Sequence, residues 1–162
     1  MLMTEKPIKA QSISIITLGV ESVARSVAFY EALGWERSPA SDEKMCTFML
    51  TSNIVLGLVP YDFLANDALL PVDPKTRYNG FTLAINGKDP AEVDALYQLA
   101  LDAGATPHEK PRYKDWGGYD GYSGYFLDPD GYPWEVACAP FLRLSEDNRL
   151  LPATKKEWEE RA

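Results

Sequence analysis

The chain has 162 residues, of which 46% are apolar and 25% are charged, so we expect a single domain with a substantial core. Its formal net charge of −8 argues against nucleic acid and anionic membranes as partners, because both would repel it. The first residues show no secretory signal, and no run approaches the roughly 20 apolar residues that a membrane-spanning helix needs. We therefore expect a cytoplasmic protein that keeps Cys46 and Cys138 as free thiols.

The first half of the chain predicts a strand, then a helix, then three more strands. The strand lies in SISIITLGV and leads into the helix VESVARSVAFYEALG, in which Val23, Val27 and Tyr30 share one face at helical spacing. Gly34 then ends the helix. The three further strands are expected near WERSP, MCTFML and NIVLGLV.

The second half repeats this order. The strand GFTLAIN precedes the helix DPAEVDALYQLALDAG, where Asp89 is the expected N-cap and Pro90 the first helical residue. Glu92 completes a capping-box pattern, and Gly104 ends the helix. Three strands follow near TPHEKPRY, GYSGYFLD and PWEVACA.

The order of strand, helix and three strands therefore occurs twice, which indicates an internal structural repeat. We expect one domain with a first module at about 12–60, a connecting segment at about 61–79 and a second module at about 80–141. Residues 142–162 are expected to form a charged, peripheral tail, whose end KKEWEERA is either a last helical turn or frayed.

Two stretches carry a resemblance to a known family. ITLGVESVARSVAFYEALGW and GYSGYFLDPDGYPWEVACAPF are similar to the opening and closing signatures of the vicinal oxygen chelate superfamily. That superfamily includes glyoxalase I, the fosfomycin- and bleomycin-resistance proteins and the extradiol dioxygenases. The resemblance extends over about residues 12–141. It implies an α+β fold, the glyoxalase/bleomycin-resistance fold, in which two paired βαβββ modules form half-barrels around a cavity.

An acidic residue interrupts the last strand. Alternation in PWEVACA puts Trp134, Val136 and Cys138 on one face and Glu135 on the other. The bulky face is expected to pack under the helices, so Glu135 faces the cavity. The turn DPDGY before this strand fits a structural hairpin with Gly131 in the left-handed conformation, and its spacing does not fit a calcium loop.

The resemblance implies metal ligands on the first, fourth, fifth and eighth strands in metal-dependent members. Glu135 matches the eighth-strand ligand, whereas Ile15 occupies the first-strand position. Thr82 occupies the fifth-strand position, or Phe81 if the register is shifted by one residue. The fourth strand NIVLGLV has no acid or imidazole, and the single histidine, His108, is expected to be exposed or at the cavity rim. Because two imidazoles and a carboxylate cannot be assembled from such a chain, we expect no metal and no other cofactor.

Without a metal, Glu135 must be hydrogen-bonded, paired or protonated. One alternative is a structural carboxylate that is satisfied by a tyrosine hydroxyl, Arg112 or Lys114. The other alternative is a group that binds a ligand.

The stretch YKDWGGYDGYSGYF interleaves aromatic residues with glycines. It contains Trp116, Tyr119, Tyr122 and Tyr125. These rings either pack the sheet as ordinary strand residues or line a ligand site. The neighbouring aspartates argue against stacking on single-stranded nucleic acid, which requires basic residues. Phe48, on the third strand of the first module, is a further candidate for the wall of the site.

The preferred function is the binding of a small, partly aromatic or apolar molecule in the cavity of a homodimer, as the resistance-type members of the family suggest. A metal-dependent lyase, isomerase or dioxygenase is the alternative, and a partner-binding module with a vestigial cavity is a third. Binding is favoured over catalysis, and no catalytic residue is assigned. The expected ligand-binding residues are Ile15, Phe48, Thr82, Arg112, Trp116, Tyr119, Tyr122 and Glu135.

Overall fold

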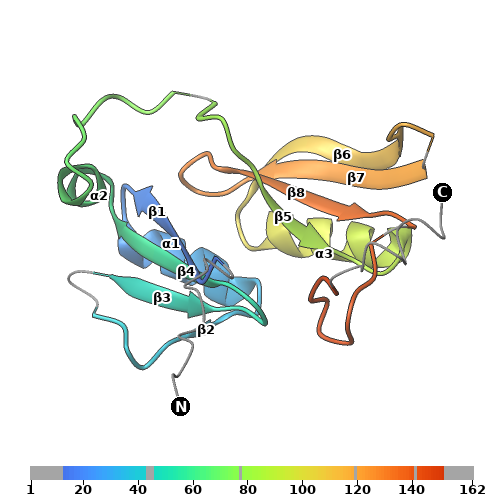
Figure 1. Cartoon of the computed structure of the whole chain (residues 1–162), viewed down its shortest axis with the longest axis horizontal. Coiled ribbons are helices and arrows are strands. Elements are labelled where there is room, and N and C mark those ends of the chain that lie inside the picture. The colour runs from blue at the N-terminus through green and yellow to red at the C-terminus, as the bar shows by residue number, and fades with distance from the viewer. Residues whose placement is uncertain (1–12, 43–45, 77, 119, 141, 152–162) are drawn as a thin grey trace, which may run out of the picture.

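The chain folds into two βαβββ modules, each with a four-stranded sheet (Figure 1). The computed structural model describes residues 13–42, 46–76, 78–118, 120–140 and 142–151. The expected α+β fold and the internal repeat are confirmed, and the sheets are open half-barrels rather than closed barrels. Within the described ranges, no helix is long and apolar enough to cross a membrane.

The first module has the strand order β1-β4-β3-β2, with β1 parallel to β4 and the other neighbours antiparallel. Its strands and helix lie where the sequence predicted them. They are β1 (Ile15–Val20), α1 (Val23–Ala32), β2 (Glu36–Arg37), β3 (Thr47–Leu50) and β4 (Val55–Pro60).

The second module repeats this topology with the order β5-β8-β7-β6, and β5 runs parallel to β8. Its elements are β5 (Leu83–Asn86), α3 (Pro90–Asp102), β6 (Thr106–Asp115), β7 (Asp120–Leu127) and β8 (Pro133–Cys138).

The caps of the two long helices explain why they begin and end at these residues. Ser22 caps α1 by accepting from the Arg25 backbone N–H, and Asp89 caps α3 in the same way. The Glu92 carboxylate accepts a hydrogen bond from the backbone N–H of Lys88. The capping-box pattern implies the N–H of the N-cap Asp89, which is one residue later. Both helices are followed by a glycine with positive φ, as predicted, at Gly34 (93°) and Gly104 (105°).

The segment that connects the modules differs from the prediction, because it begins with an additional helix, α2 (Tyr61–Asp67). This helix packs over β1 at Gly19, where an added Cβ would lie 3.0 Å from Tyr61. Its seven residues have no side-chain N-cap bond, so the sequence carried no start signal for it. Phe81, the alternative residue for the fifth-strand position, precedes β5 and packs against Tyr132 with ring centroids 5.8 Å apart.

The tail is only partly peripheral. Residues 142–151 fold back on the second module, where the Asn148 amide donates to Glu92 at 3.1 Å. A bridge between Leu144 and Leu150 closes this segment into a short loop. The last stretch, KKEWEERA, lies outside the described residues.

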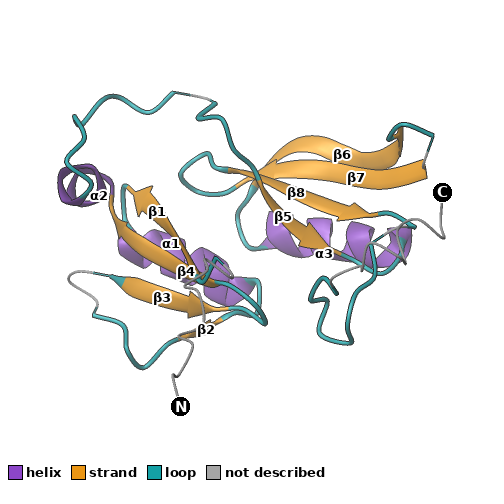
Figure 2. Cartoon of the chain, viewed as in Figure 1, coloured by secondary structure: helices purple, strands orange, loops and turns teal. Residues whose placement is uncertain are grey.

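Each long helix covers one face of its own sheet (Figure 2). Buried side chains of both modules form one hydrophobic core. The α1 residues Phe29 and Tyr30 reach the second sheet, where their rings meet Phe126 and Trp134 at 6.3 and 5.8 Å between centroids. Val136 of β8 is fully buried on this side, as strand alternation predicted. We call the opposite face of each sheet its outer face.

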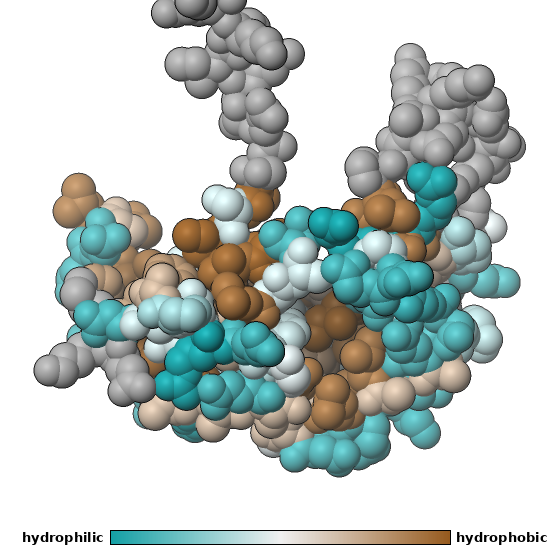
Figure 3. All heavy atoms as spheres, turned by 90° about the horizontal axis from the view of Figure 1, so that it is seen from below, coloured by the Kyte–Doolittle hydropathy of each residue, from teal (hydrophilic) through white to brown (hydrophobic). Residues whose placement is uncertain are grey.

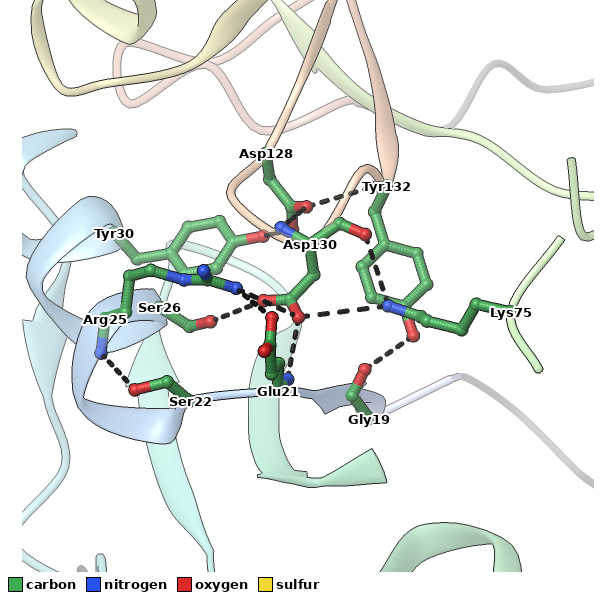
Figure 4. Close-up of polar contacts among 10 residues, drawn as sticks. All are labelled: Gly19, Glu21, Ser22, Arg25, Ser26, Tyr30, Lys75, Asp128, Asp130 and Tyr132. Atoms are coloured by element: carbon green, nitrogen blue, oxygen red, sulfur yellow. Dashed lines mark hydrogen bonds and ion pairs between the residues drawn. The ribbon is translucent and has the colours of Figure 1, made fainter. Parts of the chain in front are cut away.

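The turn between β7 and β8, residues Asp128–Tyr132, locks the modules together, and we call it the clamp turn (Figure 4). Asp128 is 3% exposed and accepts from the Tyr30 hydroxyl at 2.6 Å. It also accepts the backbone N–H groups of Asp130 and Tyr132 at 2.9 Å each. Gly131 has φ of 83°, so the predicted structural hairpin is confirmed.

A second aspartate of the clamp turn holds the start of α1. Asp130 accepts from the Glu21 backbone N–H at 2.7 Å and from the Ser26 hydroxyl at 3.0 Å. The Arg25 guanidinium lies 3.5 Å away and the Lys75 ammonium 4.0 Å away. This carboxylate therefore fixes α1 of the first module to the hairpin of the second.

Candidate functional site

Polar side chains converge on the outer face of the second sheet around Glu135. Trp134 is 4% exposed against the helices, so Glu135 lies on the opposite, outer face of β8, as alternation predicted. The expectation that this face lines a cavity stays a prediction. The antiparallel register sets Tyr125 of β7 directly opposite it, and the parallel register sets Ala84 of β5 on its other side. Thr82, two residues before Ala84, borders the same face.

Glu135 has a tyrosine as its partner, one of the structural partners expected from the sequence. The Tyr125 hydroxyl lies near the Glu135 carboxylate and the Thr82 side chain and interacts with both. Burial raises the pKa of Tyr125, and the charge of Glu135 and the hydrogen bond to it raise this pKa further. Tyr125 therefore keeps its proton at neutral pH and is a donor beside the Glu135 acceptor.

The two cations that were expected beside Glu135 pair with a different acid. Arg112 Nε lies 2.8 Å from one oxygen of Glu109, and Lys114 Nζ lies 2.7 Å from the other. Irregular pairing along β6 sets Glu109 opposite Tyr125 and Arg112 opposite Ser123, so both side chains share the outer face. The hydrogen bond from Lys114 lowers the pKa of Glu109, and Arg112 adds to this effect.

Ser123 and Trp116 extend the outer face away from Glu135. Ser123 lies two residues from Tyr125 on β7, is fully buried, and its hydroxyl has no hydrogen-bond partner among the residues the structure describes. The Trp116 ring covers Gly121, where any Cβ would collide with the indole. Burying a hydroxyl without a hydrogen-bond partner is unfavourable, and a polar group of a ligand can supply the missing hydrogen bond.

Two of the expected aromatic residues do not join this site. Tyr122 points to the helix side, where its hydroxyl donates to Asp94 of α3 at 2.9 Å. Its ring packs against Tyr113 with centroids 4.9 Å apart, so it is an ordinary strand residue, which was the other alternative for the aromatic stretch. Tyr119 lies outside the described residues.

The remaining candidates lie on the outer face of the first sheet. Ile15 pairs with Val55 and is 49% exposed. Phe48 pairs with Gly57, which also sits opposite Thr17. Ile15 and Phe48 therefore belong to a different sheet from Glu135.

The residues present do not fit the metal site that the family resemblance implies. Ile15 and Thr82 stand at two of the ligand positions, and β4 contributes only apolar residues and glycine. His108 is exposed on β6. Within the described parts of the chain, no group of three or more His, Cys, Asp and Glu side chains could hold a metal ion.

Sequence reasoning missed the roles of Glu109 and Ser123 and did not assign Tyr125 to Glu135. One signal was available, because residues equally distant from a hairpin turn face each other across it. Counting outward from the clamp turn pairs Tyr125 with Glu135. No such count could place Glu109, because the irregularities along β6 shift its register.

Comparison with known families gave one match. The model of the Glyoxalase/Bleomycin resistance protein/Dioxygenase superfamily matches residues 12–136. Comparison with curated protein sequences gave no significant match.

Several solved structures are similar to this chain. A glyoxalase-related enzyme from Fulvimarina pelagi is 27% identical, with a TM-score of 0.73, and the match covers 89% of this chain and 99% of that one. A glyoxalase/bleomycin resistance protein from Albidiferax ferrireducens T118 is 26% identical, with a TM-score of 0.56 and coverage of 77% and 97%. A lactoylglutathione lyase from Agrobacterium tumefaciens is 21% identical, with a TM-score of 0.58 and coverage of 80% and 94%, and shows the shared fold alone.

Proposed function

This chain belongs to the glyoxalase/bleomycin resistance protein/dioxygenase superfamily, and from that premise we propose that it binds a small, partly apolar molecule without transforming it. The binding site in this proposal is the outer face of the second sheet. The ligand would lie along β7 and β8, with its polar group at Glu135 and its apolar part at Trp116.

The observation that carries this proposal is the mixed chemistry of the outer face. Glu135 and Tyr125 offer a paired acceptor and donor, whereas Ser123 offers a buried hydroxyl with no partner within the described ranges. Trp116 adds an aromatic surface over Gly121, two residues along β7 from Ser123. A few convergent polar groups beside an aromatic surface are typical of small-molecule sites.

A second copy of the chain would complete the site in this proposal. The outer face of the first sheet is apolar at Ile15 and Phe48, and Ile13 beside it is 69% exposed. An open sheet face with exposed apolar residues favours a partner surface. We therefore expect a homodimer in which Ile15 and Phe48 of one copy face Glu135 and Trp116 of the other.

Sequestration fits the site better than the metal-dependent lyase, isomerase or dioxygenase alternative. Those reactions need an ion to hold two vicinal oxygens of the substrate. The chemistry of Ile15, Thr82 and β4 supplies no ligands for such an ion beside Glu135.

Tryptophan fluorescence tests the proposal. A panel of aromatic metabolites and drugs would be screened for saturable quenching, and the best hit would be titrated into wild type, Glu135→Gln and Tyr125→Phe. We expect both variants to bind about tenfold more weakly, since each loses one half of a hydrogen-bonded pair.

Tyr122→Phe is the matched control, because Tyr122 lies on the same strand as Tyr125 but on the helix side. It should bind the hit as wild type does. Equal affinity in all four proteins would place the site elsewhere, and a monomer mass by light scattering at high concentration would contradict the shared site.

A further inference from the structure

A hollow lies between the two modules, mainly on the helix side of the sheets (Figure 3). It has a volume of about 730 Å³, within the usual range for small-molecule sites. Its apolar walls come from both modules, so neither module alone forms it. They include Ile16, Trp35, Leu56, Leu83, Leu96 and Trp134.

This hollow is separate from the outer face that carries Glu135. Trp134 lines the hollow, whereas its neighbour Glu135 points to the other side of β8. Thr82 and Ala84 border both regions, because β5 is the edge strand of its sheet and Thr82 lies just before it. A ligand in the hollow therefore does not need the Glu135 site.

Residues 145–150, which we call the strap, form one side of the hollow and join the two modules there. The Ser52 hydroxyl of the first module donates to the Asp147 carbonyl at 3.3 Å. On the second module, the Lys88 ammonium donates to the Glu146 carbonyl at 2.9 Å, and the Asn148 amide donates to Glu92 at 3.1 Å. The strap is thus held by polar bonds and leaves the apolar space behind it unfilled.

The lining determines what class of molecule fits. The indoles of Trp35 and Trp134 lie 5.6 Å apart between centroids and provide aromatic contact surface. The exposed charged residues at the mouth are Glu36, Asp147 and Arg149, two acids and one base. With a net chain charge of −8, this mouth disfavours an anionic ligand.

We propose that this hollow is a second binding site, which takes a neutral aromatic molecule of about two or three rings. Walls from both modules would contact such a molecule, and the strap would border it on one side. An open apolar cleft of this size at the boundary between two modules is a typical place for a small-molecule ligand.

N-Phenyl-1-naphthylamine is a suitable probe, because it is neutral and aromatic and accepts excitation energy from tryptophan. Titration into the full chain should give saturable emission with energy transfer from Trp35 and Trp134. Leu96→Trp fills the hollow from α3 and should weaken binding by about tenfold or more. Leu99→Trp, on the same helix but 39% exposed and not in the lining, should leave affinity within about twofold.

Two further variants complete the experiment: a second substitution that narrows the hollow, and a control that alters only the outer-face site. Leu83→Phe narrows the hollow from β5, so it replaces Leu96→Trp if circular dichroism shows that the latter is unfolded. Glu135→Gln should bind the probe as wild type does, which separates this site from the proposed outer-face site. Absence of saturable probe binding overturns the inference, whatever its cause, including a hollow filled by the ends of the chain itself. Equal weakening of probe binding by Leu96→Trp and Leu99→Trp also overturns it.

Discussion

The two places where the modules meet differ, although the same βαβββ order stands on both sides. At the first, the clamp turn (Asp128–Tyr132) inserts two aspartates against α1 and seals the boundary. At the second, the corresponding β3–β4 turn, residues 51–54, has no aspartate, and the strap bridges the gap. We call these the closed junction and the open junction.

The difference shows how a repeat can combine stability with a cavity. At the closed junction, buried carboxylates meet hydroxyl and backbone donors, which holds the modules in one arrangement. At the open junction, the contacts lie at the surface and the apolar walls remain apart. The closed junction therefore fixes the geometry that the open junction needs to keep its hollow.

The largest expected effect is at Asp128. Asp128→Ala leaves the Tyr30 hydroxyl and two backbone N–H groups without their buried acceptor, so it should cost about 3 kcal/mol of unfolding free energy. Asn53→Ala, in the turn of the open junction, should cost less than about 0.5 kcal/mol because Asn53 is exposed. Urea unfolding of both variants measures this contrast, and similar losses would contradict it.

Alkaline pH should weaken the closed junction. Burial raises the pKa of Tyr132 to about 12, with added effects from the charges of Asp128 and Asp130, whereas an unfolded tyrosine titrates near 10. The folded state holds the proton longer, so this stabilisation is complete below about pH 10 and is lost as the pH rises to about 12. The loss should be about 2 kcal/mol.

The control for this pH effect is Tyr132→Phe, which has no proton to lose at that position. Its unfolding free energy should fall less steeply between pH 10 and 12 than that of wild type. Parallel curves for the two proteins would show that Tyr132 does not couple folding to pH.

Local patterns predicted much of this molecule, but not its junctions. Helical spacing and the Asp89 cap located the long helices, and strand alternation placed Glu135 on the outer face. The bond from Tyr30 to Asp128 joins residues 98 positions apart, so no local pattern could reveal it. The bond from Arg112 to Glu109 was missed because the irregular pairing of β6 changes which side chains are neighbours.

A matched pair of serines sharpens the comparison. Ser26→Ala removes a buried donor to the Asp130 carboxylate, whose side chain is 3% exposed at the closed junction, and should cost about 1.5 kcal/mol. Ser52→Ala removes an exposed donor to the strap and should cost no more than about 0.5 kcal/mol. Chemical denaturation of the two variants tests the contrast, which fails if Ser52→Ala is the more damaging change.

Apart from the control substitutions Asn53→Ala and Ser52→Ala, the smallest of these effects should come from the strap, at Asn148. This residue has φ of 59°, a left-handed conformation that asparagine and glycine tolerate better than alanine does. Asn148→Ala loses the bond to Glu92 and adds backbone strain, so it should cost about 1 kcal/mol. Asn148→Gly loses the same bond without the strain and should cost less than about half of that.

Because the strap forms one wall of the hollow, hydrogen exchange of residues 145–150 should rise in Asn148→Ala while exchange in the clamp turn stays unchanged. Equal exchange changes at both places would mean that the two junctions open together, and the distinction between a closed and an open junction would then be lost.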